Sequence, residues 1–289
     1  MPLKSALYVV ATPIGNLNDI SLRALNVLAQ VDMIAAEHVQ TSRHLLSHHA
    51  IAVKNTRLIA LHQHNEKTSA NKILAFLAEG KSVALITDAG TPAISDPGAI
   101  LVQHVREHGF TVIPVPGANA AISALSAAGI SNPHFLFYGF LPAKSGPRQR
   151  ELASLAALPY TLIFYEAPHR VLESLNDMTT LLGAQRQLTL ARELTKLFET
   201  IHTCTLGKAA AWIKADSHRQ KGEFVLLVSG RQDQEKSAIS DQAQKTLKLL
   251  MTELPLKQAV KLTAEISGEN KNALYQLALA IKSSAHLNV

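Results

Sequence analysis

The hydrophobic and polar positions of the chain follow two alternating rhythms, which predict strands followed by helices. Short apolar runs bounded by turn residues predict buried strands, and in the N-terminal part these are Leu7–Ala11, Met33–Ala36, Leu58–Leu61, Val83–Ile86 and Thr111–Val115. Stretches with helical periodicity lie between them, at Ser21–Gln30, Thr41–His49, Thr68–Glu79 and Ala99–His108. Apolar strands joined by helices are typical of a parallel or mostly parallel sheet covered on both faces. We therefore expect an α/β domain over residues 1–116.

A second α/β domain, with a mixed sheet, is predicted for residues 117–230. A helix of small residues over Ala118–Ala128 is followed by apolar runs at Phe135–Leu141, Thr161–Tyr165, Leu188–Ala191 and Phe224–Val228. Residues 199–205 alternate with a period of two, which indicates an antiparallel strand. The remaining residues, 231–289, are expected to form a polar linker up to Asp241 and a helical tail, with two short helices over Pro255–Ile281.

Composition and charge exclude several classes of protein. Of the 289 residues, 47% are hydrophobic and 17% are charged, which excludes wholesale disorder. No apolar run approaches the roughly 20 residues that cross a bilayer, and the N-terminus lacks a signal-peptide pattern, so we expect a cytoplasmic protein with no membrane partner. One cysteine, Cys204, excludes a disulfide framework and a cysteine-based zinc site. The net charge of +6 is compatible with a phosphate-rich partner.

The loop at residues 87–98 is the strongest candidate for a ligand site. The chain has neither a P-loop nor a G-x-G-x-x-G motif. Instead, twelve residues with two Gly, two Pro and two Asp follow a predicted buried strand, where a mere connection needs about 2–6 residues. Small residues let the main chain approach an adenosine or amino-acid moiety, and Asp88 or Asp96 can accept from a ribose hydroxyl or an ammonium group. Loops at residues 12–17 and 114–121 follow strands at the same edge of the sheet.

Basic groups gather on three loops of the second domain, at residues 138–148, 165–170 and 192–196. Positive charges held at one edge suit a phosphodiester backbone. Histidines gather at residues 44–64, but no H-E-x-x-H motif or Cys/His spacing accompanies them, so we expect no metal site.

Seven short stretches, taken in order, resemble one known family. They are Thr12–Leu17, His64–Glu66, Thr87–Pro92, Gly139–Pro142, Tyr165–Glu166 with His169–Arg170, Ala191–Lys196, and Lys221–Glu223. The chain is similar in them to the ribosomal RNA small-subunit methyltransferase I group of the tetrapyrrole-methylase-type (class III) S-adenosylmethionine methyltransferases. The resemblance covers Leu7 to Gly230 almost without gaps, and the tail resembles the small helical C-terminal region of that family.

The resemblance implies S-adenosylmethionine as the donor, in a cleft between the two domains. The acceptor that it implies is the ribose 2′-hydroxyl of a cytidine in the decoding centre of small-subunit (16S) ribosomal RNA. The resemblance also implies a homodimer. The donor pocket is then expected to be lined by Pro13, Gly15, Asp88, Ala89, Gly90, Thr91, Ile94, Ala120, Ala121, Tyr165, Gly222, Glu223 and Phe224. The RNA side is expected at His64, Asn65, Glu66, Lys144, Arg148, His169, Arg170, Arg192 and Lys196.

Deprotonation of a ribose hydroxyl calls for a base. Glu37, Glu66, Glu166, His169 and Glu193 are possible bases, and we favour Glu166 because it stands beside the expected donor pocket, with Glu37 and His169 next. One stretch departs from the family. Its members usually read Glu-Asp-Thr-Arg after the second strand, whereas this chain has Glu37-His38-Val39-Gln40, and Ala118 stands where the group often has proline.

Because of the departure at residues 37–40, a changed target or a slow enzyme stays open. Two other functions also remain as alternatives. One is a tetrapyrrole methylase, which the basic loops disfavour. The other is a catalytically idle RNA- or ribosome-binding relative that retains the fold, for which the departure is the only support in the sequence.

Overall fold

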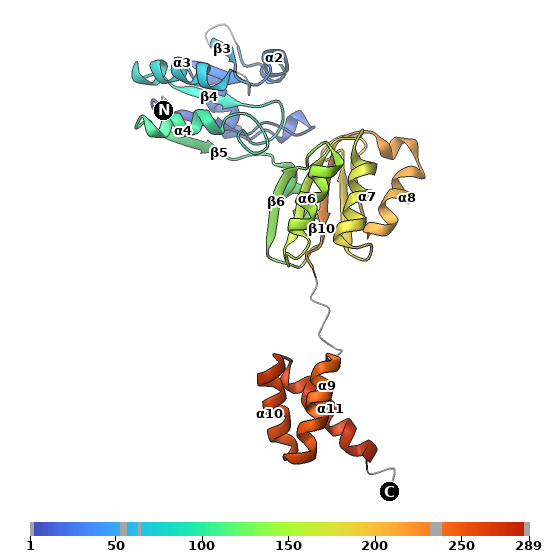
Figure 1. The fold of residues 1–289 in the computed structure, drawn as a ribbon. Helices are drawn as coiled ribbons and strands as arrows, with labels where there is room; N and C mark the ends of the chain where they lie inside the picture. Colours follow the sequence, from blue (N-terminus) through green and yellow to red (C-terminus); the bar gives the residue numbers. More distant parts are fainter. Residues whose placement is uncertain (1–2, 53–56, 63–64, 232–238, 286–289) are drawn as a thin grey trace. The chain divides into compact units, whose positions relative to one another are not determined.

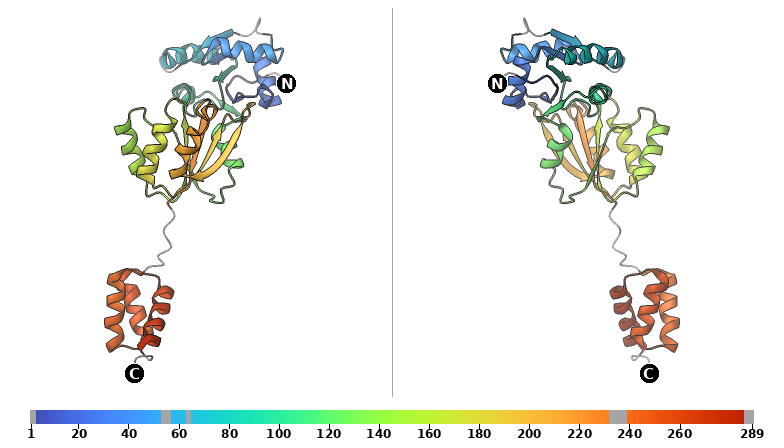
Figure 2. Two further views of the ribbon diagram at one scale, coloured as in Figure 1. Left: turned by 90° about the vertical axis from the view of Figure 1, so that its right-hand side faces the viewer. Right: turned by 90° about the vertical axis from the view of Figure 1, so that its left-hand side faces the viewer.

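A computed structural model of the chain describes residues 3–52, 57–62, 65–231 and 239–285. The chain divides into two compact units, Met1–Arg231 and Gln232–Val289. The described part of the first unit contains two five-stranded sheets flanked by helices, and that of the second contains helices α9, α10 and α11 (Figures 1 and 2).

The N-terminal sheet is parallel throughout, as the apolar runs predict. Its strand order is β3-β2-β4-β1-β5, with the bounds β1 (Leu7–Val10), β2 (Met33–Ala36), β3 (Arg57–Ala60), β4 (Val83–Ile86) and β5 (Val112–Val115). Helices α1 (Leu22–Gln30) and α2 (Val39–His48) pack on one face, and α3 (Glu66–Ala78) and α4 (Ala99–Glu107) on the other. Both faces are thus buried, which is why the strands are continuously apolar.

The second sheet is mixed, with the order β6-β7-β10-β8-β9. Its strands are β6 (Phe135–Phe140), β7 (Thr161–Glu166), β8 (Gln187–Arg192), β9 (Thr200–Thr205) and β10 (Phe224–Val228). Strand β6 runs parallel to β7, while β10 is antiparallel to β7 and β8, and β9 is antiparallel to β8. The antiparallel strand expected from the alternation at residues 199–205 is confirmed.

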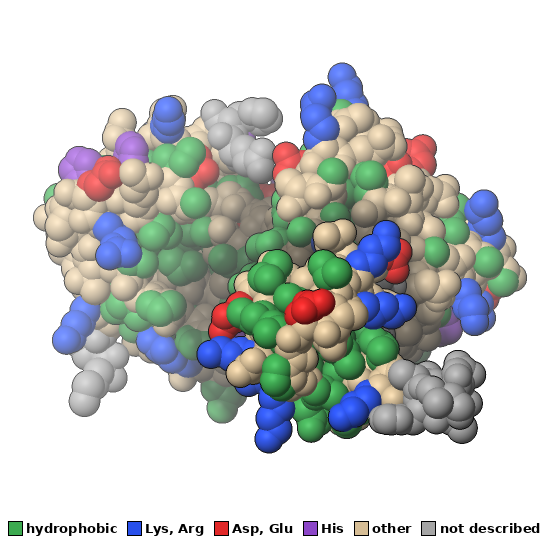
Figure 3. Space-filling view, turned by 60° about the horizontal axis from the view of Figure 1, so that its bottom comes forward, with side chains coloured by type: hydrophobic (Ala, Val, Ile, Leu, Met, Phe, Trp, Pro, Cys, Tyr) green, Lys and Arg blue, Asp and Glu red, His purple; other side chains and the backbone are tan. Residues whose placement is uncertain are grey.

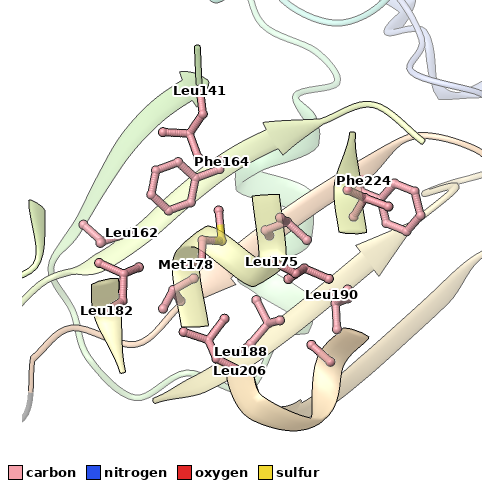
Figure 4. Close-up of a cluster of buried hydrophobic side chains, with 14 of the residues drawn as sticks. Leu141, Leu162, Phe164, Leu175, Met178, Leu182, Leu188, Leu190, Leu206 and Phe224 are labelled. Carbon is pink, nitrogen blue, oxygen red and sulfur yellow. The ribbon is translucent and has the colours of Figure 1, made fainter. Parts of the chain in front are cut away.

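Alternate residues of β10 serve two separate cores, because successive side chains of a strand point to opposite faces. Phe224, Leu226 and Val228 pack on one face with α6 (Ser145–Leu155), α7 (Val171–Leu182) and α8 (Leu206–Lys214). Figure 4 shows this cluster, in which Leu175 and Met178 of α7 point at Phe164, Leu188 and Leu190 of the sheet. Val225 and Leu227 face the other way, toward the short helix α5 (Ala120–Ala127).

A buried arginine joins α6 to α7. Arg148 is 1% exposed; its Nε donates to Asp177 Oδ2 at 2.7 Å and its Nη1 to the Ala143 carbonyl at 3.0 Å. We expected Arg148 to contact RNA, but here its guanidinium lies inside the second domain. The correction follows from a partner 29 residues away, on a helix that the local pattern does not connect to residue 148.

The second unit is a cluster of three helices among the described residues: α9 (Asp241–Glu253), α10 (Leu256–Ser267) and α11 (Lys271–Ala285). Two of them match the helices expected over residues 255–281, and Gly268 ends α10 in the left-handed conformation at the expected break. Helix α9 was not predicted, because the buried residues on it are only Ala243 and Leu247. Within the described part of the chain, no helix is both long and apolar enough to span a membrane.

Candidate functional site

The loops after β1 and β4 are joined beyond the ends of their strands. Thr12 N donates to the Gly90 carbonyl at 2.9 Å and Gly90 N donates to the Thr12 carbonyl at 3.0 Å. The Thr12 hydroxyl also donates to the Thr87 carbonyl at 3.0 Å. Because β1 and β4 are neighbours in the sheet, the two candidate loops of the first domain form one structure at its carboxyl edge.

The loop at residues 87–98 is strained and anchored at several points. Ala93 and Ser95 have φ angles of 67° and 63°, a region that L-residues rarely adopt. Glu66 fixes the far end of the loop: it is 4% exposed, and its Oε1 accepts from Gly98 N at 3.1 Å and Leu101 N at 2.9 Å. Such conformations persist where the surroundings over-determine them, commonly at ligand sites.

A cavity of about 440 Å³ opens against this loop. Sites for small ligands generally have volumes of about 300–1,000 Å³. The cavity is lined by both domains: by Ile14, Ala89, Gly90, Thr91, Ile94, Ser95 and Asp96 from the first, and by Asn119, Ala120, Phe140, Tyr165, Glu166, Ala167, Pro168, His169, Ala191, Leu194, Glu223, Phe224 and Val225 from the second.

Two titratable groups of this cavity, Asp96 and Tyr165, have shifted pKa values. Burial, and then the negative charges of Glu37 and Asp88, raise the pKa of Asp96 to about 6. Burial and the charge of Asp96 raise the pKa of Tyr165, whose hydroxyl accepts from Ala121 N at 3.2 Å. The half-buried Asp96 and the Tyr165 phenol therefore line the same cavity, and burial raises the pKa of both.

Two glycines permit close approaches of the chain beside the cavity: Gly15 between the two domains, and Gly222 within the second domain. A Cβ on Gly15 would stand 2.6 Å from Lys196 Cγ, and one on Gly222 would stand 2.4 Å from Glu193 Cγ. The first loop touches the second domain here, since Asn16 N donates to the Thr195 hydroxyl at 3.1 Å. Gly15 and Gly222 thus permit close contact and do not themselves line the cavity.

The stretch that departs from the family lies next to the candidate loop. His38 Nδ1 is 2.7 Å from Asp88 Oδ2, and Glu37 Oε2 accepts from Asp88 N at 3.3 Å. The ligand-type atoms of these three residues lie within 4.8 Å of one another. Because His38 and Asp88 already pair with each other, we assign no metal ion to them.

Comparison with known families accounts for most of the chain. Residues 6–210 match the family described as Tetrapyrrole (Corrin/Porphyrin) Methylases. Residues 237–282 match the RsmI C-terminal HTH domain.

Two curated relatives span almost the whole chain. Ribosomal RNA small subunit methyltransferase I of Escherichia coli O157:H7 is 54% identical over 94% of each chain. The protein of the same name from Haemophilus influenzae is 50% identical over 96% of this chain and 98% of its own. The chain belongs to the ribosomal RNA small subunit methyltransferase I family. The methyltransferase and the fold class expected from the sequence are both confirmed.

Solved structures place the family within a wider fold. The methyltransferase CobJ has a TM-score of 0.58 at 20% identity and covers 78% of this chain and 94% of its own. Uroporphyrin-III C-methyl transferase from Thermus thermophilus, complexed with S-adenyl homocysteine, has a TM-score of 0.54 at 16% identity and covers 77% of this chain and 96% of its own. At these identities the likeness is one of fold.

The expected donor residues divide into two groups in this member of the methyltransferase I family. Eight line the cavity: Ala89, Gly90, Thr91, Ile94, Ala120, Tyr165, Glu223 and Phe224. Pro13, Gly15, Asp88, Ala121 and Gly222 are not among the lining residues. Ala121 nevertheless holds Tyr165 through its N–H, and Asp88 contributes charge at the edge of the cavity.

Sequence reasoning missed several lining residues, namely Ile14, Ser95, Asn119, Ala167, Pro168, Ala191, Leu194 and Val225. Most are small or apolar and carry no chemical signal of their own. Phe140 stood within a family motif but had no assigned role; it is 52% exposed and lies edge-on to Tyr165, with ring centroids 5.6 Å apart. Only the structure shows that this aromatic ring is exposed and lines the cavity, which marks Phe140 as a candidate ligand contact.

Several residues expected on the RNA side are buried and partnered. Besides Arg148, the structure buries Glu66 as the cap of α4 and leaves Arg192 7% exposed. The guanidinium of Arg192 donates to the carbonyls of Lys221, Phe198 and His218 at 2.6, 3.1 and 2.7 Å. These side chains organise loops and offer no free group to a phosphate, which corrects the expectation for them.

The other expected RNA residues differ in how free they are. Asn65 holds its own loop, accepting from His62 N and donating to the Ala60 carbonyl. Lys196 Nζ lies 2.8 Å from Glu193 Oε1 and from Glu223 Oε2. Lys144 and His169 are exposed, and His169 lines the cavity. His64 lies outside the described residues.

Glu166, our favoured base, has both carboxylate oxygens engaged. It is 2% exposed; Oε1 accepts from Ala167 N at 2.9 Å and from Arg170 Nε at 2.8 Å, and Oε2 accepts from the Ser174 hydroxyl at 2.5 Å. Arg170 in turn donates to the Leu141 carbonyl at 3.2 Å. A carboxylate bound in this way fixes the turn from β7 into α7 and has both oxygens engaged within the protein, so the structure argues against our first choice. Arg170 is engaged in the same interaction.

Glu166→Gln is therefore expected to act on stability more than on turnover. The amide loses the ion pair with Arg170 inside the protein, which should lower the free energy of unfolding by about 1–3 kcal/mol. Turnover with saturating substrates should stay within about threefold of wild type, because no interaction confined to the transition state is removed. Urea unfolding and steady-state methyl transfer measure the two effects. Glu107→Gln, which makes the same chemical change at an exposed position of α4, is the control; a tenfold loss of turnover at unchanged stability would return Glu166 to the role of base.

Proposed function

We propose that this chain transfers a methyl group from S-adenosylmethionine to the ribose 2′-hydroxyl of a cytidine in the decoding centre of small-subunit (16S) ribosomal RNA. One observation carries the proposal. A relative named for small-subunit ribosomal RNA methylation is 54% identical over 94% of the chain, and six of the seven stretches that carry the family resemblance contribute residues to one cavity between two domains.

The cavity fits such a donor in size and in chemistry. Its walls combine small residues, which let the main chain reach a ligand, with apolar side chains such as Ile14 and Leu194. Gly90 contributes to this cradle at a φ of 80°, where a Cβ would be strained. The donor, when bound, supplies an activated sulfonium methyl group. The chain's main task is then alignment of the two substrates, which can account for roughly 7–11 kcal/mol of the barrier.

On the RNA side, the proposal relies on exposed basic groups of the second domain. Lys144 begins α6 and is exposed, and His169 stands at the mouth. Lys196 is partly exposed between Glu193 and Glu223. On the face shown in Figure 3, Lys and Arg side chains are spread over the surface and are not gathered in one block. Phosphate contacts of this kind would position the RNA, and the cavity would select the nucleotide.

The helical tail supports the same substrate class. Its match to a helix-turn-helix domain covers residues 237–282. Six exposed lysines stand on its described helices: Lys245, Lys248, Lys257, Lys261, Lys271 and Lys282. We include a grip on the ribosomal subunit by this tail, a homodimeric state and a cytoplasmic location in the proposal.

The test is transfer of a labelled methyl group to small ribosomal subunits that lack the modification, with naked ribosomal RNA alongside. We expect label on one ribose 2′-hydroxyl of a decoding-centre cytidine, located by ribose mapping, and more transfer to subunits than to naked RNA.

Other results would change the assignment in defined ways. Label on a base or at another nucleotide would mean that the departure at residues 37–40 accompanies a different target. No label with intact donor binding would exclude this acceptor. Absence of both label and donor binding would favour an idle relative that binds the ribosome.

A further inference from the structure

Asp96 differs from the other acidic residues that line the cavity. Glu166 is paired with Arg170 and hydrogen-bonded by Ser174, and Glu223 is paired with Lys196. Among the residues that the structure describes, none of the ion pairs involves Asp96. It is thus the carboxylate of the cavity that has no ionic partner, although the Thr87 hydroxyl lies near enough to lower its pKa against the larger effect of burial.

The backbone holds Asp96 in place with more constraints than a loop needs. The residue lies between Ser95 at a φ of 63° and Gly98 at 132°. The Thr91 hydroxyl donates to the Ala118 carbonyl at 3.2 Å, and Ala93 N donates to the Pro97 carbonyl at 3.2 Å.

The second domain also packs closely against this loop. A Cβ on Gly139, at a bulge of β6, would come within 2.7 Å of Ser95 Oγ. The backbone at Ser95 has an unfavourable φ, and the second domain lies close to its side chain. Such backbone conformations occur mainly where the position of a side chain matters for function.

The titratable groups near Asp96 come from both domains. Glu37 follows β2 and Asp88 follows β4, and the negative charge of each raises the pKa of Asp96. His38 pairs with Asp88 at 2.7 Å. Across the cavity lie the phenol of Tyr165 and the imidazole of His169, together with the partnered Glu166 and Glu223.

Burial and like charges shift the pKa of Asp96 upward to about 6. A base is most effective when its pKa lies near the working pH, because it is then both deprotonated and able to take a proton. An ordinary exposed aspartate is a much weaker base than this one.

We propose that Asp96 accepts the proton of the 2′-hydroxyl during methyl transfer. The role rests on the function proposed above. As the ribose oxygen attacks, an O–C bond forms to the methyl carbon, and the C–S bond breaks with its electron pair left on sulfur. The 2′-hydroxyl proton passes to the Asp96 carboxylate and is later released to water. The neutral phenol of Tyr165 faces the carboxylate throughout and carries no charge that would compete for the proton.

Asp96→Asn tests the role, since the amide keeps the size of the side chain and cannot take the proton. In single turnover with saturating donor and ribosomal subunits, the wild-type rate should rise about tenfold per pH unit below pH 6 and level off above it. The variant should be about 10²–10⁴-fold slower at pH 7.5 and should lose this limb. Donor and subunit dissociation constants should change by less than about threefold.

Thermal melting checks independently that Asp96 is a partly buried carboxylate with a raised pKa. A carboxyl whose folded pKa is raised destabilises the fold as pH rises from about 4 through 6. Asp96→Asn should therefore raise the melting temperature at pH 7.5, and by less at pH 5. Glu107→Gln, which makes the same chemical change at an exposed position of α4, should leave rate and melting temperature at the wild-type values.

Several results would overturn the role of Asp96. One is a variant with the wild-type rate and pH profile; another is weaker donor binding with an unchanged rate at saturation, which would make Asp96 a donor ligand. A wild-type single-turnover rate that is flat from pH 5.5 to 8 would overturn it even if the variant failed to fold. If wild type transfers no methyl group to subunits at any pH, the proposed function fails and this role fails with it.

Discussion

Replacing Arg148 with alanine is expected to lower the free energy of unfolding by about 3–5 kcal/mol, because it removes one partner of a buried ion pair. The Arg148 side chain is 2% exposed and that of Asp177 is 13% exposed. Asp177 would keep hydrogen bonds from Gln149 at 2.8 Å and Ser145 at 3.1 Å but would lose the cation that neutralises it. The cavity left by the guanidinium and its carbon chain adds to the loss.

The pH dependence of this effect has a definite sign. Although burial opposes it, hydrogen bonds from Gln149 and Arg148 leave the pKa of Asp177 below its usual value. Such a carboxylate stabilises the fold above its unfolded pKa of about 3.8 and loses that contribution as pH falls through its folded pKa. The cost of Arg148→Ala should therefore be largest near neutral pH.

Urea unfolding of the full chain at pH 7.5 measures the cost. Arg150→Ala, at an exposed arginine of the same helix, is the matched control and should change the free energy of unfolding by less than about 0.5 kcal/mol. Equal and small effects of the two substitutions would show that the buried pair contributes no net stability.

The second large effect is expected at Glu66, where alanine and glutamine should differ. Glu66→Ala removes the acceptor of the Gly98 and Leu101 N–H groups, leaving two buried donors without it, at a cost of about 1–3 kcal/mol each. The same change loosens the far end of the strained loop that carries Asp96. We expect methyl transfer to fall at least about tenfold as well, since small misplacements of catalytic groups are costly.

Glu66→Gln supplies the control, because its amide oxygen can still accept both hydrogen bonds. It should recover most of the stability and activity, apart from the favourable charge of a carboxylate at the start of α4. Melting curves and single-turnover rates of the two variants make the comparison. If Glu66→Ala lost stability but kept its activity, Glu66 would stabilise the start of α4 without positioning the loop that carries Asp96.

The strands were predictable because their signal is local. Apolar runs such as Val83–Ile86 are buried at every position, and the alternation at residues 200–205 is visible without any partner. The loops that line the cavity were also predictable, since a long stretch of Gly, Pro and Asp after a buried strand has few other uses.

The roles of single polar residues were not predictable in the same way. Glu66 reaches Gly98 across 32 positions, and Arg192 reaches Lys221 across 29. Such pairings depend on how the loops fold back, which the periodicity of the sequence does not encode. For this reason Glu66, Arg148 and Arg192, which we expected to contact RNA, instead form hydrogen bonds inside the protein. Glu166 and Asp96 differ in the same respect: sequence shows two acids beside a strand end, and only the structure shows which one is already occupied.

The contact between Gly139 and Ser95 has a consequence for how the enzyme could change during evolution. Strand β6 lies at the edge of the second sheet, a position where side chains usually vary freely, yet a methyl group at residue 139 would push on the loop that carries Asp96. Selection on the chemical step would thus act on a position of β6 whose residue does not itself line the cavity. If the substrate changed during evolution, we expect this glycine to be retained while exposed residues such as Lys144 and His169 are substituted.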